Sequence, residues 1–311
     1  MELKNKKILV TGGAGFLGSS IVRQLVQDGL NQKDIIVYRS KELDLREKEN
    51  CIKATKGIDI VIHAAGNVGG IGKNNMYPAT LFYDNLIMGA HLLEASKIND
   101  VKKLVIIGTI CAYPKYTPVP FKEENLWIGY PEETNAPYGL AKKMLLVGAQ
   151  AYRKQYGLQS IYLLPVNLFG PGDNFDLESS HVIPALIKKF LEAVLKNKKY
   201  VVIWGDGSPT REFLYVEDAA RGIILATKNY DKKEPINLGT GKEISIHELA
   251  NLIAKLVGFT GEIRWDTTKP NGQPKRSLDI SKAKKEFGFV AQADFTNALK
   301  KTIKWYKEHL T

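Results

Sequence analysis

Long hydrophobic runs and cysteine are both scarce in this sequence of 311 residues. No uninterrupted stretch of about 18 apolar residues occurs, and the basic start MELKNKK leads straight into the strand-like KILV. We therefore expect neither a transmembrane helix nor a secretory signal. Two cysteines, Cys51 and Cys111, cannot form a disulfide framework or a cysteine-rich metal cluster. That scarcity predicts a reducing, cytoplasmic location.

Arginine is also scarce. The formal net charge of +11 arises from 36 lysines and only 8 arginines, scattered along the chain. The sequence contains no arginine-rich stripe with interleaved aromatic residues, which is the pattern that nucleic-acid grooves use. We therefore expect no nucleic-acid partner and interpret the lysines as a solvated surface. A small ligand that carries phosphate would also suit a basic protein.

Short apolar runs alternate with amphipathic stretches in the first half of the chain. The apolar runs predict buried parallel strands at Lys7–Val10, Ile35–Tyr38, Asp59–His63, Lys103–Ile107 and Ser160–Pro165. Helical patterns between them cover Phe16–Asp28, Arg46–Thr55, Ala79–Ser96 and Tyr138–Tyr156. This alternation predicts an α/β fold, a Rossmann-like doubly wound parallel sheet with right-handed crossovers.

The pattern is looser after Pro165. We predict a polar loop at Gly170–Ser180 and a strand at Tyr200–Trp204. Helices are predicted at Ile183–Leu195, from Val216 onward, at Ile246–Val257 and at Asn297–His309. The segment INLGTG covers Ile236–Gly241, and a turn-rich stretch covers Lys269–Lys275. Residues 1–169 plus about 211–241 are predicted to form the cofactor-binding domain. Residues of about 170–210 plus 242–311 are predicted to form a smaller α/β substrate lobe.

A glycine-rich turn joins the first predicted strand to the first predicted helix. The sequence VTGGAGFLG runs from Val10 to Gly18. Gly12 and Gly15 permit a tight turn and the approach of backbone to a pyrophosphate, and Gly18 lets the helix pack against the sheet. The helix N-terminus would face the phosphates, so we predict dinucleotide binding. No Gly-Lys-Ser/Thr follows, which excludes a P-loop.

The second predicted strand ends in cations. An NAD enzyme places an Asp or Glu about 20 residues after the glycine turn, where it binds the ribose 2′-hydroxyl. Here the strand ends Val37-Tyr38-Arg39-Ser40-Lys41. Arg39, helped by Lys41, would bind a 2′-phosphate that an acid would repel. We therefore predict NADPH as the cofactor, the alternative being two surface cations at a strand end.

Tyr138 and Lys142 lie one helical turn apart in the sequence YGLAK. A free tyrosine, with a pKa of about 10, is a poor acid at neutral pH. A neighbouring ammonium and the nicotinamide cation are expected to stabilise the phenolate and lower that pKa. Thr109, at the end of the fourth strand, would hydrogen-bond a substrate carbonyl while Tyr138 donates its proton.

These motifs together resemble the extended short-chain dehydrogenase/reductases and, among them, the GDP-L-fucose synthases. The resemblance covers nearly the whole chain. Its densest segments are Asn67–Ile71 with Asn74–Ala79, Cys111–Pro114, Thr134–Lys142, Pro165–Lys189 and Trp204–Asp218. It implies NADPH-dependent 3,5-epimerisation and 4-reduction of GDP-4-keto-6-deoxy-D-mannose to GDP-L-fucose.

The resemblance also assigns site residues. The catalytic residues would be Thr109, Cys111, Tyr138, Lys142 and His181, where Cys111 and His181 form the epimerisation pair. Cofactor contacts would be Gly12, Gly13, Ala14, Gly15, Phe16, Leu17, Gly18, Arg39, Ile107, Gly108, Thr109, Ile110, Lys142, Pro165, Val166, Asn167, Leu168 and His181. Substrate contacts would be Lys189, Trp204, Arg211 and Arg276. Two positions depart from the family: Thr109 replaces a serine, and Ala14 stands where an arginine is frequent, so the NADPH preference depends more on Arg39.

Epimerisation next to a ketone needs two groups that exchange protons. A C4 ketone acidifies the protons on C3 and C5, and one group removes each proton while another returns it from the opposite face. A thiol and an imidazole have suitable pKa values, about 8.5 and 6.5. On an extended segment Cys111 would point the same way as Thr109. Without the resemblance, Cys111 would be interpreted as a core residue and His181 as a helix cap.

Other interpretations remain open. The chain could act on another GDP-linked keto sugar, such as a heptose or a dideoxyhexose, retain only one activity, or bind a cofactor without catalysis. His63, His91, His247 and His309 show no metal-ligand spacing and are interpreted as surface or packing residues, so no metal is predicted. A homodimer is expected through the two helices Ala79–Ser96 and Tyr138–Tyr156, as in similar enzymes.

Overall fold

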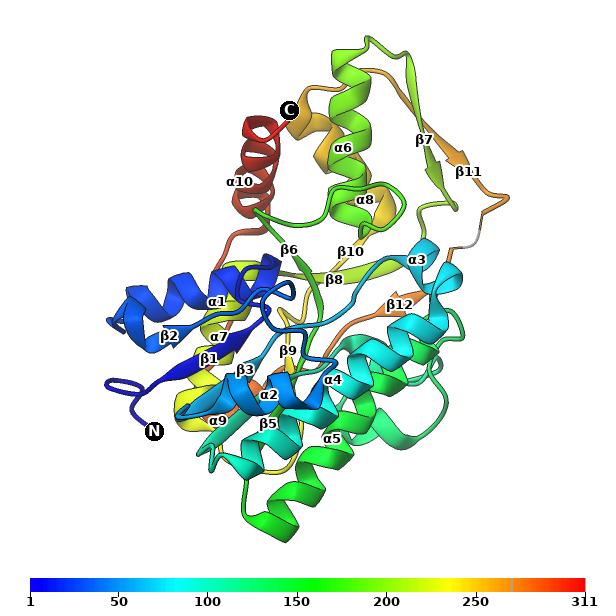
Figure 1. The fold of residues 1–311 in the computed structure, drawn as a ribbon. Helices are drawn as coiled ribbons and strands as arrows, with labels where there is room; N and C mark the ends of the chain where they lie inside the picture. The colour runs from blue at the N-terminus through cyan, green and yellow to red at the C-terminus, as the bar shows by residue number, and fades with distance from the viewer. Residues whose placement is uncertain (270, 311) are drawn as a thin grey trace.

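The centre of the molecule is a sheet of parallel strands in the order β2-β1-β3-β4-β5-β9 (Figure 1). The structure, a computed structural model, describes residues 1–269 and 271–310. The strands are β1 Ile8–Thr11, β2 Ile35–Ile36, β3 Ile60–His63, β4 Lys103–Ile107, β5 Gln159–Pro165 and β9 Ile236–Leu238. The α/β class and the parallel sheet are as predicted, and β4 has the predicted bounds. β2 is shorter than predicted because the chain leaves the sheet after Ile36.

Helices cover both faces of this sheet. α1 (Phe16–Gln27) packs with α7 (Val216–Asn229), while α4 (Pro78–Ile98) packs with both α2 (Lys48–Thr55) and α5 (Ala136–Tyr156). Pro137 stands in the first turn of α5, where a missing amide costs nothing, and Gly157 ends the helix with φ 72°. The predicted doubly wound arrangement is confirmed, and each helix predicted between these strands is present within two residues of its expected bounds.

Two smaller sheets follow β5, and their strands come from distant parts of the chain. One sheet has the order β10-β8-β12, with β6 also paired to β8, and the other pairs β11 with β7. Their bounds are β6 Asn167–Phe169, β7 Tyr200–Trp204, β8 Thr210–Tyr215, β10 Glu243–Ser245, β11 Glu262–Asp266 and β12 Lys275–Arg276. The remaining helices are α3 Ile71–Met76, α6 Val182–Leu195, α8 Ile246–Val257, α9 Ser281–Phe287 and α10 Phe295–Glu308. The predicted turn Lys269–Lys275 includes Pro270, which lies outside the described residues.

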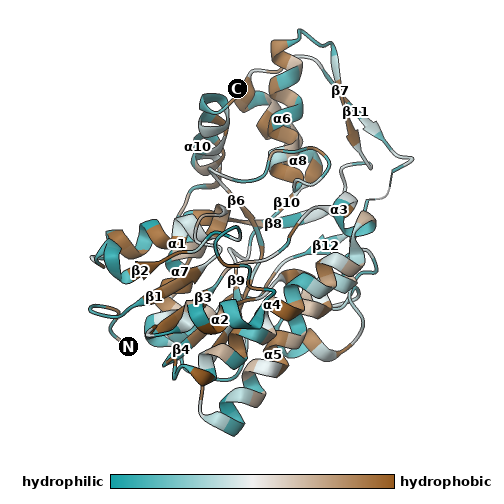
Figure 2. Cartoon of the chain, in the orientation of Figure 1, coloured by the Kyte–Doolittle hydropathy of each residue, from teal (hydrophilic) through white to brown (hydrophobic). Residues whose placement is uncertain are grey.

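The buried residues form two main hydrophobic cores. The first surrounds the parallel sheet, and the second lies among α6, α8 and α10. The hydrophobic residues of α6 and α8 are brown in Figure 2. Phe16 and Leu17, at the start of α1, pack against the second core, so this helix begins where the two cores meet. Phe287 and Phe289 belong to the first core, although the predicted boundary assigned them to the smaller lobe. No helix in residues 1–269 and 271–310 is long and apolar enough to cross a membrane.

Candidate active site

The glycine turn after β1 leaves no space for side chains at two positions. A Cβ on Gly12, whose φ is +69°, would lie 2.8 Å from the Ala65 backbone. A Cβ on Gly18 would lie 2.0 Å from the Gly12 carbonyl oxygen. Gly15 is the N-cap residue of α1, and Ala14 beside it is exposed. The backbone of the turn is therefore held close to the first turn of α1, an arrangement that suits a pyrophosphate.

Arg39 lies on an exposed turn just beyond β2. Its backbone amide donates to Glu42 Oε2 at 2.7 Å, and the Leu43 amide donates to the Arg39 carbonyl at 3.0 Å. Val37, two residues earlier, contacts the glycine turn, because a Cβ on Gly13 would lie 2.6 Å from its side chain. The exposed guanidinium is thus carried by a fixed backbone close to the turn. Glu42, the acid that fixes this backbone, was not predicted from the sequence.

Thr109, Tyr138 and Lys142 are close together at the carboxyl end of β4. Thr109 follows this strand, and its hydroxyl oxygen accepts the Cys111 amide at 3.2 Å. Tyr138 projects from α5, and its phenol lies beside the Thr109 side chain. Lys142 lies one turn further along α5, and both of these helical side chains are buried. The three side chains predicted to carry out reduction therefore lie at the same end of the sheet.

Burial dominates the ionisation of the two helical side chains. It raises the pKa of Tyr138, Cys111 raises it further, and the neighbouring Thr109 hydroxyl acts in the opposite direction. Burial also lowers the pKa of Lys142 to about 8. The lowered tyrosine pKa expected from the sequence is therefore not a property of the protein alone. A cation beside the phenol, such as an oxidised nicotinamide ring, would supply it.

Cys111 lies beside Arg276 from β12. Arg276 Nη1 donates to Cys111 Sγ at 3.7 Å. The same guanidinium donates through Nε and Nη2 to Gln273 Oε1 at 3.1 and 2.9 Å. Gln273 is buried, and its Nε2 donates to the Lys115 carbonyl at 2.6 Å. Hydrogen bonds therefore fix the guanidinium against the sulfur.

The local geometry expected for Cys111 was wrong. Only Thr109 is extended, with φ −159° and ψ 146°, and Ile110–Ala112 forms a 3-10 turn. Cys111 still reaches the site because this turn lies against α5. At Gly139 a Cβ would be 2.3 Å from the Cys111 carbonyl oxygen, so the helix and the turn are in close contact.

His181 is the N-cap residue of α6, yet its side chain makes no cap hydrogen bond within the described part of the chain. The interpretation of His181 as a helix cap therefore lacks support. The residue as a whole is exposed by surface area, but enough protein atoms lie around its imidazole to weaken the hydration of the charged ring. Loss of hydration and then the positive charge of Arg276 lower its pKa. His181 thus lies in the field of the same guanidinium that contacts Cys111.

Arg211 and Arg276 face each other across two strands. They are register partners in the parallel pair β8 and β12. Burial, and then the charge of Arg276, lower the pKa of Arg211 to about 10. Two neighbouring guanidinium groups repel each other unless an anion lies between them. This pair can therefore bind a diphosphate.

Lys189 and Trp204 lie at the α6–β7 side of the second core. Lys189 Nζ donates to the Val202 carbonyl at 3.1 Å, and burial lowers its pKa. Trp204 ends β7 with its side chain 60% exposed, and the Lys269 ammonium lies 5.8 Å from its ring centroid. An exposed indole face of this kind can stack on a base.

The other predicted cofactor contacts follow the ends of β4 and β5. The Gly108 amide donates to the Leu163 carbonyl at 2.7 Å, and the Val166 amide donates to the Leu238 carbonyl at 2.9 Å. Asn167 Nδ2 donates to the Glu212 carbonyl at 3.0 Å. The residues placed at these two strand ends are Ile107, Gly108, Ile110, Pro165, Val166, Asn167 and Leu168. They lie at the same edge of the sheet as the glycine turn, since all of these strands are parallel.

The structure contains two buried polar residues whose hydrogen bonds were not predicted from the sequence. Glu212 is fully buried and accepts the Gly241 amide at 2.9 Å and the Leu278 amide at 2.7 Å, which holds the sheet that carries Arg211 and Arg276. His63, interpreted as a packing residue, is buried with Nδ1 2.8 Å from Thr11 Oγ1. Its Nε2 has no partner among residues 1–269 and 271–310. A charged residue inside the strand sequence TREFLY was the available signal for Glu212.

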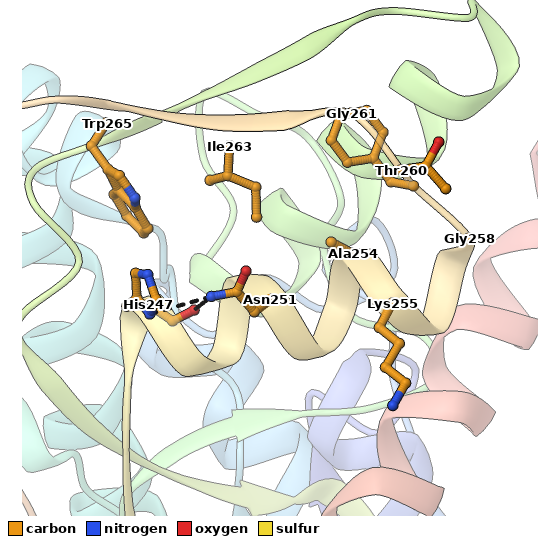
Figure 3. Close-up of a pocket in the computed structure, with 10 residues that line it drawn as sticks. His247, Asn251, Ala254, Lys255, Gly258, Thr260, Gly261, Ile263 and Trp265 are labelled. Carbon is orange, nitrogen blue, oxygen red and sulfur yellow. Dashed lines mark hydrogen bonds between the residues drawn. The ribbon is translucent and has the colours of Figure 1, made fainter.

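A separate cavity of about 550 Å³ lies between α8 and β11. Figure 3 shows His247 and Asn251 of α8 facing Ile263 and Trp265 of β11. The His247 ring stacks on Trp265 with centroids 5.8 Å apart. None of the described lining residues is a predicted catalytic, cofactor or substrate residue. His247, predicted to be a surface or packing residue, is exposed and forms part of this cavity wall.

Comparisons with known proteins agree with this architecture. Residues 8–239 match the NAD dependent epimerase/dehydratase family. A GDP-L-fucose synthase of Sinorhizobium fredii is 45% identical over 278 residues, which cover 89% of this chain and 88% of the relative. A GDP-6-OMe-4-keto-L-xylo-heptose reductase from C. jejuni superposes with TM-score 0.92 at 30% identity, covering 99% of each chain. A GDP-L-fucose synthetase from Naegleria fowleri bound to NADP gives TM-score 0.90 at 31% identity, covering 98% of this chain and 95% of that one.

The resemblance inferred from the sequence is thereby confirmed, and so is the enzyme class. The roles of the individual site residues remain predictions. The chain belongs to the NAD dependent epimerase/dehydratase family of extended short-chain dehydrogenase/reductases and, within it, to the family of the GDP-L-fucose synthases.

Proposed function

We propose that this chain is an NADPH-dependent enzyme that epimerises C3 and C5 and reduces C4 of GDP-4-keto-6-deoxy-D-mannose, forming GDP-L-fucose. One observation carries the proposal. The thiol of Cys111 is hydrogen-bonded to Arg276, and it also lies close enough to Tyr138 to raise its pKa. Groups suited to proton exchange and groups suited to carbonyl reduction therefore share one site.

The residues present fit a dinucleotide with a 2′-phosphate. At Gly12 and Gly18 a Cβ would collide with backbone, so the turn keeps its amides open to a pyrophosphate. Arg39 is exposed at the end of the second strand, where it would bind the 2′-phosphate. Lys142 would hold the ribose and nicotinamide end. When bound, NADPH supplies the hydride that C4 accepts.

Reduction then needs one proton at the C4 oxygen. The Thr109 hydroxyl hydrogen-bonds that oxygen and orients it toward Tyr138. Tyr138 donates its phenolic proton as the alcohol forms. The raised pKa of Tyr138 keeps the phenol protonated until that moment. The Lys142 ammonium stabilises the phenolate that remains.

Epimerisation precedes reduction, because only a ketone at C4 acidifies the protons on C3 and C5. Cys111 and His181 remove a proton and return one to the opposite face at each carbon. The lowered pKa of His181 leaves its imidazole neutral and basic at neutral pH. Thr109 and Tyr138, hydrogen-bonded to the C4 oxygen, stabilise the enediolate.

The nucleotide part of the substrate would bind at the edge of the second core, along four predicted contact residues. Arg211 and Arg276 would bind the diphosphate, while Lys189 and Trp204 would contact the nucleoside. A second candidate substrate is a GDP-linked 4-keto heptose. It is favoured by the TM-score of 0.92 to a heptose reductase, and the choice between the sugars depends on a few pocket residues.

The proposal extends to assembly and location. We propose a homodimer built on α4 and α5, which pack together and expose Phe82, Tyr83, Met144 and Val147. We propose a division into a cofactor domain and a nucleotide-sugar lobe, which the two main hydrophobic cores support in outline, although Phe213 and Tyr215 of the predicted cofactor domain belong to the second core. We also propose a cytoplasmic location, since both cysteines are free.

The decisive test is product analysis. The enzyme is incubated with NADPH and GDP-4-keto-6-deoxy-D-mannose, and the product is identified by nuclear magnetic resonance and mass spectrometry. We expect stoichiometric oxidation of NADPH and the configuration of GDP-L-fucose. GDP-6-deoxy-D-talose or GDP-D-rhamnose would mean that epimerisation is absent, and turnover of the GDP-linked heptose alone would favour the second candidate.

A further inference from the structure

The loop that carries His181 rests on a glycine-containing segment, Gly69–Gly72, which follows the third strand of the sheet. The Gly70 amide donates to the Ser179 carbonyl at 2.8 Å. A Cβ on Gly70 would lie 2.5 Å from the Ser180 carbonyl oxygen. A Cβ on Gly72 would lie 2.9 Å from the Glu178 carbonyl oxygen. The three residues before His181 are therefore in contact with Gly69–Gly72.

Backbone conformation does not explain these glycines. Gly70 has φ −68° and ψ −176°, values that any residue adopts. Gly72 lies within α3, and its φ is not positive. Alanine could therefore take either backbone conformation without strain. The methyl group of an alanine would instead collide with the carbonyl oxygens of the His181 loop and displace them.

The Gly69–Gly72 segment is braced from the other side. Asn74 is buried, and its Nδ2 donates to the carbonyls of Gly69 and Gly70 at 2.8 and 3.0 Å. Just upstream, Asn85 Nδ2 from α4 donates to the Asn67 carbonyl at 2.8 Å. Because this side is fixed, an added methyl group would displace the His181 loop.

A displacement there would reach the imidazole. The Ser180 amide donates to the Asp176 carbonyl at 2.7 Å, and Ser179 Oγ donates to Asp176 Oδ2 at 2.7 Å. These hydrogen bonds make residues 176–180 a tight turn, so a push on one carbonyl oxygen would shift the whole turn. Ser180 precedes His181 directly, and His181 begins α6. By contrast, Tyr138 and Lys142 project from α5 and do not depend on this loop.

We propose that Gly70 and Gly72 are positioning residues for His181, fixing its distance from C3 and C5 for proton transfer while leaving reduction at C4 untouched. This inference rests on the proposed function. An ordinary carbon–oxygen contact is about 3.3 Å, so Gly70→Ala must shift the loop by close to 1 Å. A misplacement of that size costs on the order of 100-fold in a step that depends on alignment.

Two reactions separate the two activities. The first is deuterium incorporation at C3 and C5 of the 4-keto sugar in heavy water with oxidised cofactor, which needs Cys111 and His181. The second is single-turnover oxidation of GDP-L-fucose, in which the C4 hydride moves to NADP⁺ and the hydroxyl proton to Tyr138. This reverse reaction requires no epimerisation. We expect Gly70→Ala to lose about 10- to 100-fold in exchange, Gly72→Ala to lose less because its contact is longer, and both to keep the reverse hydride transfer.

The matched control is Gly129→Ala. Gly129 is exposed, has no positive φ, and its Cβ would meet only the Pro114 side chain, at 3.3 Å. We expect it to match the wild type in both reactions. A second check is non-additivity: Gly70→Ala combined with His181→Asn should exchange no more slowly than His181→Asn alone.

Three results would overturn the inference. Exchange at the wild-type rate in Gly70→Ala would show that the contact does not determine the position of His181. An equal loss in both reactions would assign the segment to general substrate binding or folding. Exchange absent from the wild type itself would refute the proposed epimerisation, and the inference with it.

Discussion

Arg276 lies 3.7 Å from the sulfur of Cys111, although 165 residues separate them in sequence. The contact joins a group suited to hold the nucleotide to a group suited to move protons on the sugar. Gln273 fixes the guanidinium from behind, at 2.9 and 3.1 Å. If Arg276 binds the diphosphate as proposed, the same contact would also hold the thiol in place.

Cys111→Ser should separate epimerisation from folding. A serine hydroxyl is far too weak an acid or base at neutral pH to replace the thiol. We expect deuterium exchange at C3 and C5 to fall by at least about 100-fold, and net turnover to fall with it. Cys51→Ala is the control, because Cys51 is buried in α2 away from the site. Wild-type exchange rates in both Cys111→Ser and His181→Asn would show that other groups move the protons at C3 and C5, and would overturn the roles proposed for this pair.

Tyr138→Phe should remove reduction and spare part of the exchange. Without the phenolic proton, NADPH oxidation should fall by about 10²- to 10⁴-fold. Exchange should continue at a reduced rate, since the phenol also stabilises the enediolate oxygen. Tyr152→Phe on the same helix removes a hydroxyl that donates only to Glu94, at 2.9 Å, and should behave as wild type. Retained NADPH oxidation in Tyr138→Phe would assign the proton donor to another group.

Arg39→Ala should weaken the preference for NADPH over NADH. Loss of one charge-assisted contact to a 2′-phosphate corresponds to about 1.5–3 kcal/mol, or roughly 10- to 100-fold in the ratio of kcat/KM for the two cofactors. The ratio should change because kcat/KM falls with NADPH, while kcat/KM with NADH stays the same. Arg264→Ala, which removes an exposed arginine paired with Glu262, is the control. An unchanged ratio would show that Lys41 or the backbone makes the discrimination.

Lys142→Met should stabilise the protein while it destroys activity. Burial lowers the pKa of Lys142 from 10.5 to about 8, so the folded state disfavours the charged form. Between those two values the unfolded chain holds the proton and the folded chain does not, and stability therefore rises with pH. Below about pH 8 the buried lysine is charged, and its burial lowers the free energy of unfolding by its full amount. That amount is on the order of 3 kcal/mol, because one pKa unit corresponds to about 1.4 kcal/mol.

Urea unfolding near pH 7 and near pH 10 measures this effect. The advantage of Lys142→Met over the wild type should be largest near neutral pH and shrink as the lysine loses its proton. Lys154→Met, an exposed position on the same helix, should show no such advantage. A less stable Lys142→Met at both pH values would mean that the ammonium has favourable contacts that outweigh its burial.

A dimer through α4 and α5 should be broken by charge. Tyr83 and Val147 are 59% and 44% exposed on these helices, and their burial in a partner would stabilise association. The double variant Tyr83→Glu/Val147→Glu should sediment as a monomer at micromolar concentration where the wild type sediments as a dimer. Leu195→Glu, at an exposed site on α6, should leave the mass unchanged. A monomeric wild type would refute the proposed assembly.

The sequence predicted best where local signals agree with burial. β4, β7 and α8 have the expected bounds, because apolar runs and periodicity coincide there with capping residues such as Ser245 and Gly258. The strands β6, β8, β10, β11 and β12 were missed. Their pairing depends on partners far along the chain, as in the register of Arg211 with Arg276. No local pattern encodes such a pairing.

The candidate site shows the same division. Sequence and resemblance named Cys111, His181 and Arg276 separately, but not the hydrogen bond between Arg276 and Cys111 or the anchor provided by Gln273. The extended geometry expected around Cys111 failed because a 3-10 turn forms there against α5. Close packing between distant segments decides such turns, and no local sequence pattern specifies that packing.

The late position of β9 has a consequence for synthesis on the ribosome. β5 ends at Pro165, and its partner β9 begins at Ile236, so 70 residues separate them. At about 5–20 residues per second, the nascent chain presents an unpaired edge of β5 for roughly 4–14 seconds. The edge strand sequence SIYLLP is apolar and rich in β-formers, the composition that pairs with other chains. Expression yield should therefore respond to translation speed and to chaperones that shield this edge until Ile236–Leu238 emerges.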